Sequence, residues 1–342
     1  MINGHGDDIH AYKDIRLNFS SNIYSHFRHD GLYAHLAEVL PSVTNYPEPS
    51  PERLEAALAA DLGLSPSEVI ATAGATEAIY LVAQVFRRST SYILQPTFSE
   101  YADACRIHEH RVKAIYSLKD IPGAEDGPSG GRPLLWLCIP NNPTGTVVPE
   151  AEMRHFIEIY PHTLFVIDAS YAPFTQHPLI SQKEAAALPN VIMLHSMTKE
   201  YAVPGLRLGY ITANQTLSEF LRRQRMPWTI SSISQAAAIY LLRHKADYVL
   251  PLADLLHERE RVATELAKTG VIEPWPSDTH ILLCRLRIGR ASALKEWLAT
   301  ERGILIRDAS NFEGLDASFF RIAVQTPEEN NALIAAIQEW IK

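Results

Sequence analysis

The chain has 342 residues, of which 46% are hydrophobic, and its 31 basic and 39 acidic side chains give a formal net charge of -8. This length predicts about two domains of ~150 residues, and the negative charge argues against general binding to nucleic acid or to an anionic membrane. No apolar run approaches the ~18 residues of a membrane-spanning helix, and the polar start of the chain is unlike a signal peptide. Three widely spaced cysteines, Cys105, Cys138 and Cys284, predict free buried thiols in a reducing cytoplasm.

The first 45 residues lack a long amphipathic period and predict an arm with one short helix, from about Leu32 to Val39. The arm contains five histidines, but their spacing fits no metal-ligand pattern, so we expect no metal site. An extended Pro-rich segment follows, and a helix is expected from Glu52 to Leu62. Ser50 is the predicted N-cap of this helix, and Pro51 suits its first turn.

From residue 69 onward, short apolar strands alternate with helical segments. The strands are expected at Val69–Ala73, Ser91–Gln95, Arg111–Tyr116, Leu134–Ile139, Leu164–Ile167, Val191–Leu194 and Leu208–Thr212. This alternation predicts a mostly parallel sheet with helices on both faces. The fully apolar strand at 134–139 is typical of the centre of such a sheet.

After residue 231 the pattern changes to a long helix that reaches about Thr269 and bends before Pro251. Short strands between helices follow, at Ile281–Leu286, Ile304–Ile306 and Phe319–Val324. This part predicts an α+β domain. We therefore expect an arm over residues 1–45, a large domain over 46–230 and a small domain over 231–342.

Polar residues follow several of the predicted strands, where open parallel sheets bind their ligands. The segment 74–76 links a strand to a helix, so its N–H groups suit an anion, although an ordinary turn has the same sequence. Asn142 follows another strand and fits either a site or a tight turn. Asp168 follows a third strand, with Tyr171 three residues later. Asp168 suits either a helix cap or the partner of a pyridinium nitrogen.

The segment from His195 to Tyr210 carries the most specific pattern. Lys199 follows a buried strand, with the hydroxyls of Ser196 and Thr198 nearby and Arg207 eight residues later. An amine, two hydroxyls and a guanidinium around one turn suit an aldehyde cofactor that carries a phosphate, such as pyridoxal phosphate (PLP). Desolvation and Arg207 both favour loss of the proton from Lys199. A surface turn can also have this short pattern.

The order of these motifs along the chain resembles the fold-type-I PLP enzymes and, more narrowly, the class I/II aminotransferase family. The order is Gly-Ala-Thr, Pro-Thr-Phe-x-x-Tyr, Asn-Asn-Pro-Thr-Gly, Asp-x-x-Tyr, Ser-x-x-Lys with a later Arg, and Arg-Ile-Ala-Val. The resemblance covers residues 18–329. It implies a large domain with a mostly parallel sheet between helices, and a smaller α+β C-terminal domain.

The resemblance also assigns roles in binding PLP. Lys199 would form the Schiff base and later move protons, and Asp168 would pair with the pyridine nitrogen. Asn142 and Tyr171 would bind the ring hydroxyl oxygen, and Phe98 would stack on the ring. The implied phosphate ligands are Gly74, Ala75, Thr76, Ser196, Thr198 and Arg207.

Two further arginines and one tyrosine complete the implied site. Arg321 matches the arginine that binds the α-carboxylate of the substrate, for which a bidentate guanidinium is suited. Tyr46 matches a tyrosine that reaches the cofactor phosphate of a neighbouring subunit, which implies a homodimer with shared sites. Arg307, with His5 and Asn22, would line a pocket for a phosphate on the substrate; a surface ion pair is the alternative for Arg307.

Within the family, two branches match best: histidinol-phosphate aminotransferase and L-threonine-O-3-phosphate decarboxylase. The segments 4–7, 17–22 and 306–315 resemble the decarboxylase more, which makes decarboxylation of threonine phosphate the specific expectation. The sequence departs from the decarboxylase pattern after Ile23, where Asn-Pro and a glycine are usual. No residue type distinguishes loss of a proton from loss of carboxylate. A non-enzymatic regulator on this fold is disfavoured because Lys199 is retained.

Overall fold

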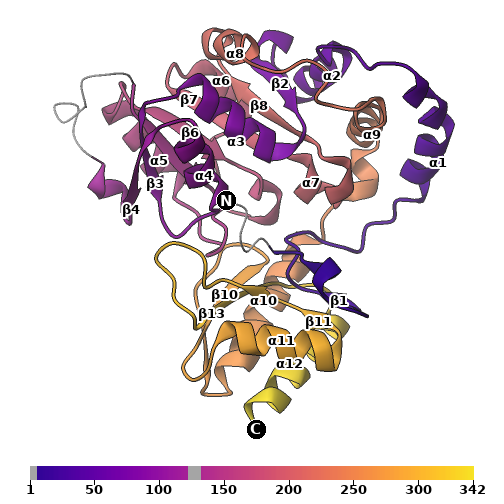
Figure 1. Cartoon of the computed structure of the whole chain (residues 1–342), viewed down its shortest axis with the longest axis vertical. Coiled ribbons are helices and arrows are strands. Elements are labelled where there is room, and N and C mark those ends of the chain that lie inside the picture. The colour runs from indigo at the N-terminus through magenta and orange to yellow at the C-terminus, as the bar shows by residue number, and fades with distance from the viewer. Residues whose placement is uncertain (1–5, 122–131) are drawn as a thin grey trace.

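The large body of the molecule contains a seven-stranded sheet. The computed structural model describes residues 6–121 and 132–342 and divides into a larger upper body and a smaller lower one (Figure 1). Only β8 runs antiparallel to its neighbours, so the prediction of a mostly parallel sheet is confirmed. In sheet order the strands are β2 (Val69–Thr72), β8 (Gly209–Ala213), β7 (Val191–Ser196), β6 (Leu164–Asp168), β5 (Leu134–Cys138), β3 (Thr90–Leu94) and β4 (Arg111–Ile115).

Helices cover both faces of this sheet because its central strands are apolar on both sides. Along β5, Leu134 and Trp136 pack into one buried cluster, and Leu135 and Leu137 pack into another. The first cluster includes α3 (Gly74–Val85), α4 (Glu100–Ile107) and α8 (Gln215–Arg222). The second includes α5 (Glu150–Ile159) and α6 (Gln182–Ala187).

A group of three helices packs beside the β2–β8 edge of the sheet. They are α1 (Asp30–Val39), α2 (Glu52–Leu62) and α9 (Ser232–Arg243). The bounds predicted for α2 are confirmed, but its predicted capping is wrong. Pro51 occupies the N-cap position without a side-chain cap, and the Ser50 hydroxyl instead accepts a hydrogen bond from the Arg225 guanidinium.

The smaller body contains an antiparallel four-stranded sheet. Its order is β12 (Arg307–Asp308), β13 (Phe319–Ala323), β10 (Ile281–Leu286) and β9 (Ile272–Pro274). Its helices are α10 (Leu252–Ala267), α11 (Ala291–Arg302) and α12 (Pro327–Ile341). The N-terminal arm joins this body because β1 (Leu17–Asn18) pairs with β11 (Ile304–Leu305).

The long helix expected over residues 231–269 is interrupted. A 3-10 turn, η8 (Lys245–Tyr248), and Pro251 separate α9 from α10. Because α9 packs with α1 and α2 while α10 packs with the small sheet, we propose that the two domains divide near Pro251 rather than after residue 230. The other 3-10 turns within residues 6–121 and 132–342 are η1 (Ile9–Ala11), η2 (Leu40–Thr44), η3 (Pro66–Glu68), η4 (Leu118–Asp120), η6 (Ala172–Phe174) and η7 (Pro204–Leu206).

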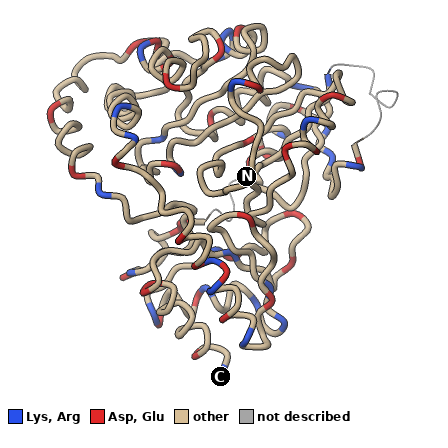
Figure 2. The backbone as a smooth tube through the Cα atoms, turned by 180° about the vertical axis from the view of Figure 1, so that it is seen from behind, with Lys and Arg blue, Asp and Glu red and all other residues tan. Residues whose placement is uncertain are grey.

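Charged residues of both signs are interspersed over the two bodies (Figure 2). Within residues 6–121 and 132–342, no helix is long and apolar enough to cross a membrane. In the same residues, no group of three His, Cys, Asp or Glu side chains is placed to hold a metal ion. The three cysteines are buried and free.

Candidate active site

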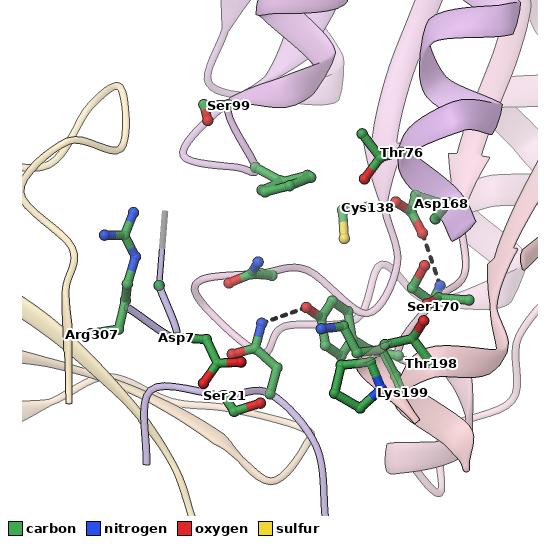
Figure 3. Close-up of a pocket in the computed structure, with 18 of the residues that line it drawn as sticks. Asp7, Ser21, Thr76, Ser99, Cys138, Asp168, Ser170, Thr198, Lys199 and Arg307 are labelled. Atoms are coloured by element: carbon green, nitrogen blue, oxygen red, sulfur yellow. Dashed lines mark hydrogen bonds between the residues drawn. The ribbon is translucent and has the colours of Figure 1, made fainter. Parts of the chain in front are cut away.

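A cavity of about 230 Å³ lies where β5, β6 and β7 end, and the N-terminal arm and the small body complete its wall. The structure brings all but three of the predicted site residues to this cavity. They are Asn22, Ala75, Thr76, Phe98, Asn142, Asp168, Tyr171, Ser196, Thr198, Lys199, Arg207, Arg307 and Arg321. Lys199 and Asp168 lie toward one side of the cavity, and Arg307 lies on the opposite wall (Figure 3).

The other three predicted residues do not line the cavity. Gly74 lies directly behind it, where a Cβ atom would stand 2.6 Å from Nη2 of Arg207. Tyr46 is outside the cavity and 89% exposed, with its ring 5.8 Å from that of Trp228. His5 lies outside the described residues.

Lys199 lies on the short helix α7 (Met197–Glu200), which directly follows β7. Burial lowers the pKa of its amine to about 8, and the nearby guanidinium groups of Arg321 and Arg207 act in the same direction. The carboxylates of Asp7 and Asp168 oppose this shift. A substantial fraction of the amine is therefore unprotonated near neutral pH, which is the form that attacks an aldehyde.

Asp168 ends β6, and its carboxylate is 4% exposed. Its Oδ2 accepts a hydrogen bond from the Tyr101 hydroxyl at 2.8 Å, and its Oδ1 accepts one from the Ser170 N–H at 2.9 Å. Burial raises the pKa of Asp168, whereas these hydrogen bonds lower it. A carboxylate that is held in this way could bind a protonated ring nitrogen.

The N-terminus of α3 and the α7 region form a cradle that fits a phosphate. Ala75 and Thr76 line the cavity where α3 begins, and the Arg207 side chain lies against the same turn. The Thr198 hydroxyl is buried and has no hydrogen-bond partner among the described residues. Helix N–H groups, a guanidinium and an unpaired hydroxyl together suit an anion, so these residues fit the phosphate of PLP.

Hydrogen bonds connect the residues that face the centre of the cavity. The Asn22 side-chain N–H donates to the Tyr171 hydroxyl at 2.6 Å. Arg321 donates from Nη1 to Oδ1 of Asn142 at 2.5 Å and from Nη2 to the Ser20 carbonyl at 2.6 Å. Burial, with a smaller contribution from the charge of Arg307, lowers the pKa of Arg321 to about 10. These contacts fix Arg321 in the cavity wall.

Arg307 lies directly across the β12–β13 pair from Arg321. Its side chain is buried, donates to Oδ1 of Asn311 at 2.6 Å and stacks over the Phe312 ring at 5.3 Å. Within the described residues it forms no ion pair with a carboxylate, so the alternative of a surface ion pair is wrong. Burial lowers the pKa of this guanidinium.

Several lining residues were not in the predicted set. Asp7 and Ser21 come from the arm, and Cys138 comes from the end of β5. Tyr101 was noted only as the last residue of the Pro-Thr-Phe-x-x-Tyr motif, although it contacts Asp168. The position of this motif after a strand was the signal that could have identified Tyr101 as a site residue.

Comparison with known proteins identifies the family. The family model for aminotransferase class I and II matches residues 14–337. A histidinol-phosphate aminotransferase of Roseiflexus castenholzii is 32% identical over 86% of this chain and 80% of its own length. A threonine-phosphate decarboxylase of Salmonella typhimurium is 29% identical over 95% of this chain and 91% of its own length.

Solved structures give the same picture. L-threonine-O-3-phosphate decarboxylase from Porphyromonas gingivalis has a TM-score of 0.89 and 35% identity, covering 95% of this chain and 99% of that one. A histidinol-phosphate aminotransferase from Sinorhizobium meliloti, solved with PLP, has a TM-score of 0.82 at 21% identity. The match covers 96% of this chain and 91% of that one, and it supports the assignment of the fold. The chain belongs to the class I and II aminotransferases, and it is an enzyme that uses pyridoxal 5'-phosphate as its cofactor.

Proposed function

We propose that this enzyme decarboxylates a small phosphorylated amino acid, with L-threonine O-3-phosphate as the specific substrate. The observation that carries the proposal is the cross-strand pairing of Arg307 and Arg321. Residues directly opposite in an antiparallel pair project from the same face with Cβ atoms about 4.5–5.5 Å apart. Both arginines line the cavity, so a substrate with two anionic groups on a short backbone suits them.

Histidinol-phosphate transamination is the second candidate. The 32% identity to such an enzyme supports it. Histidinol phosphate has one anionic group and no carboxylate, however, so it leaves Arg321 for the keto acid that a transaminase also binds. A substrate that contains both anions uses the two arginines at once, and we prefer the decarboxylase for this reason.

Each cofactor contact is proposed for a residue whose position suits it. Lys199 binds the aldehyde carbon, Asp168 pairs with the ring nitrogen, and Asn142 and Tyr171 bind the ring hydroxyl. Phe98 covers the ring. The phosphate ligands are Ala75, Thr76, Ser196, Thr198 and Arg207, with Gly74 leaving the space that Arg207 needs.

When bound, PLP supplies an electron sink for the electron pair that is left when a bond to the α-carbon breaks. The chain's own residues then decide the outcome. Arg321 holds the α-carboxylate, and Arg307 holds the distal phosphate. Lys199 lines the same cavity and would deliver a proton to the α-carbon. Asn22 borders the same pocket, and His5 is proposed to contact the phosphate with it.

The first experiment incubates the purified holoenzyme with O-phospho-L-threonine and follows CO₂ and the cofactor absorbance together. Sustained CO₂ release without an added keto acid supports the decarboxylase. Conversion of the cofactor to its pyridoxamine form without CO₂ contradicts it and supports a transaminase, which a panel of amino donors including histidinol phosphate would identify. No change in either signal contradicts the proposed substrate.

Arg307→Ala tests the phosphate subsite. Loss of a hydrogen-bonded charge of this kind costs about 1.5–3 kcal/mol, so kcat/KM for the phosphorylated substrate should fall roughly 10- to 150-fold. Arg285→Ala is the control, because Arg285 is an exposed arginine of the same sheet. Equal loss of activity on phosphorylated and unphosphorylated threonine would show that Arg307 does not bind the phosphate.

We also propose that the chain works as a homodimer in the cytoplasm. Exposed apolar side chains gather near Tyr46, which is itself 89% exposed, and they include Leu40, Val43 and Trp228. Such patches favour protein contacts. A second copy of the chain would cover these side chains, and Tyr46 would reach into the cofactor site of that copy. Light scattering of the wild type and of Val43→Glu tests this, with monomer for both as the contradicting result. The three free buried cysteines support the proposed location in the cytoplasm.

A further inference from the structure

One buried tyrosine supports the cavity from behind. Tyr101 on α4 is 1% exposed, and its hydroxyl donates to Oδ2 of Asp168 at 2.8 Å. Its ring forms a T-shaped pair with that of Phe98, with centroids 5.8 Å apart and planes at 85°. Tyr101 thus contacts both a residue proposed to bind the ring nitrogen of PLP and one proposed to cover the ring.

The orientation of Tyr101 is fixed by a chain of contacts beneath it. Its ring stacks on that of Trp136 with centroids 5.8 Å apart and planes at 26°. The Trp136 indole N–H donates to the Ser91 hydroxyl at 3.1 Å, which lies 2.8 Å from Nδ1 of His110. The other ring nitrogen of His110 lies 2.8 Å from the Ala83 carbonyl. These contacts fix the orientation of the Tyr101 ring, so its hydroxyl donates a hydrogen bond to Asp168 in a single geometry.

Asp168 needs such a partner because it is almost completely buried. An ionised carboxylate in this position is stabilised only by donors and opposite charges. The Ser170 N–H occupies Oδ1, and the Tyr101 hydroxyl occupies Oδ2. Lys199 acts on Asp168 through its charge, while Cys138 lies against the same carboxylate. Tyr101 is therefore a side-chain donor to one carboxylate oxygen of Asp168, and the Ser170 backbone N–H is the donor to the other.

We propose that Tyr101 is a positioning residue of this enzyme: its hydroxyl keeps Asp168 ionised and aligned toward the ring nitrogen of PLP, and its ring sets the position of Phe98. This inference rests on the role proposed for Asp168, but it is independent of the substrate and of the bond that breaks. It predicts that the hydroxyl of Tyr101 affects cofactor binding in the absence of any substrate.

The experiment measures the PLP dissociation constant of the apoprotein between pH 5.5 and 9 for a double-mutant cycle of Tyr101→Phe and Asp168→Asn. Tyr101→Phe keeps the ring and removes only the hydroxyl. We expect roughly tenfold weaker binding at pH 7, with the acid limb of the affinity profile moved up by about one pH unit, because the ionised carboxylate loses a donor. In the Asp168→Asn background the same change should have little effect.

Tyr80→Phe is the matched control. The Tyr80 hydroxyl donates to a carboxylate oxygen of Glu100 at 2.9 Å, away from the cavity, so its removal should leave PLP binding unchanged. Replacement of Tyr101 by 3-fluorotyrosine gives a test of opposite sign that does not depend on the Phe variant folding. The stronger donor should move the acid limb to lower pH.

Two results for Tyr101→Phe would overturn the inference. One is a Tyr101→Phe variant that binds PLP with the wild-type affinity and pH profile; the other is an equal loss in both Asp168 backgrounds, which indicates a general structural role. If Asp168→Asn alone binds PLP as the wild type does, the proposed role of Asp168 fails, and this inference fails with it. A negative assay with O-phospho-L-threonine affects only the proposed reaction, because no substrate is present here.

Discussion

Gly74→Ala should weaken cofactor binding much more than it weakens the fold. Gly74 has a φ of +84°, and a Cβ atom there would lie 2.6 Å from Nη2 and 3.2 Å from Cζ of Arg207. An L-residue in the left-handed region costs roughly 1–2 kcal/mol in conformational strain. The clash itself is relieved cheaply, because the guanidinium is the far end of a flexible and exposed side chain. That movement takes Arg207 away from the proposed phosphate cradle.

The loss of cofactor affinity follows from the contact that is displaced. A hydrogen bond from a charged group contributes about 1.5–3 kcal/mol, so the dissociation constant for PLP should rise roughly 10- to 150-fold. Gly63→Ala is the matched control: Gly63 has a φ of +65° at the end of α2, and a Cβ atom there meets nothing within 4 Å. Both variants should lose about 1–2 kcal/mol of unfolding free energy, which urea titration of the apoproteins measures.

Absorbance titration of the apoproteins with PLP separates the two effects. Gly74→Ala should bind weakly, and Gly63→Ala should bind as the wild type does. Arg207→Ala should reproduce the loss, and adding Gly74→Ala to it should cause little further change. The reasoning is refuted if Gly74→Ala and Gly63→Ala bind PLP equally well, because Arg207 would then keep its contact despite the added methyl group.

Two other predictions concern Lys199 and a buried ion-pair network. The rate at which the apoprotein captures PLP should rise with pH with its midpoint near pH 8, because burial lowers the pKa of the Lys199 amine to about 8 and only the neutral amine reacts. A midpoint near the pKa of an ordinary lysine, about 10.4, contradicts this. Glu55→Gln should cost about 3 kcal/mol of unfolding free energy, because the 3% exposed carboxylate pairs at 2.5 Å with both Arg222 and Arg225. Asp61→Asn, which breaks a more exposed pair, should cost below about 1 kcal/mol by the same urea titration, and equal losses would contradict the argument.

The part of the site that could be predicted from sequence lies at strand ends. Asp168 is the last residue of the buried strand β6, and Lys199 lies on the short helix directly after the buried strand β7. Parallel strands in one sheet bring their carboxyl ends to the same edge. The motif order then supplied the remaining cofactor ligands. Local sequence was sufficient there because each residue is placed by the strand that directly precedes it.

Contacts between distant segments could not be predicted in this way. Tyr101 and Asp168 are 67 positions apart, and Tyr101 has the pattern of an ordinary core residue on an amphipathic helix. The reversed direction of β8 was also hidden, since a fully buried strand has the same apolar composition in either orientation. The interruption between α9 and α10 depends on which body each helix packs against, and helical periodicity does not report that.

Under the proposed roles, the choice of substrate depends on the arginine pair of the small sheet rather than on the motifs proposed to bind the cofactor. Arg307 lies on a strand of two residues, and its side chain faces the cavity only because β12 pairs with β13 in the register that places it opposite Arg321. A shift of one residue would turn Arg307 to the other face of the sheet and leave every proposed PLP contact in place. The proposed PLP contacts of the large body are therefore independent of the small body, whose register and loops would set the distance between the two anions of the proposed substrate.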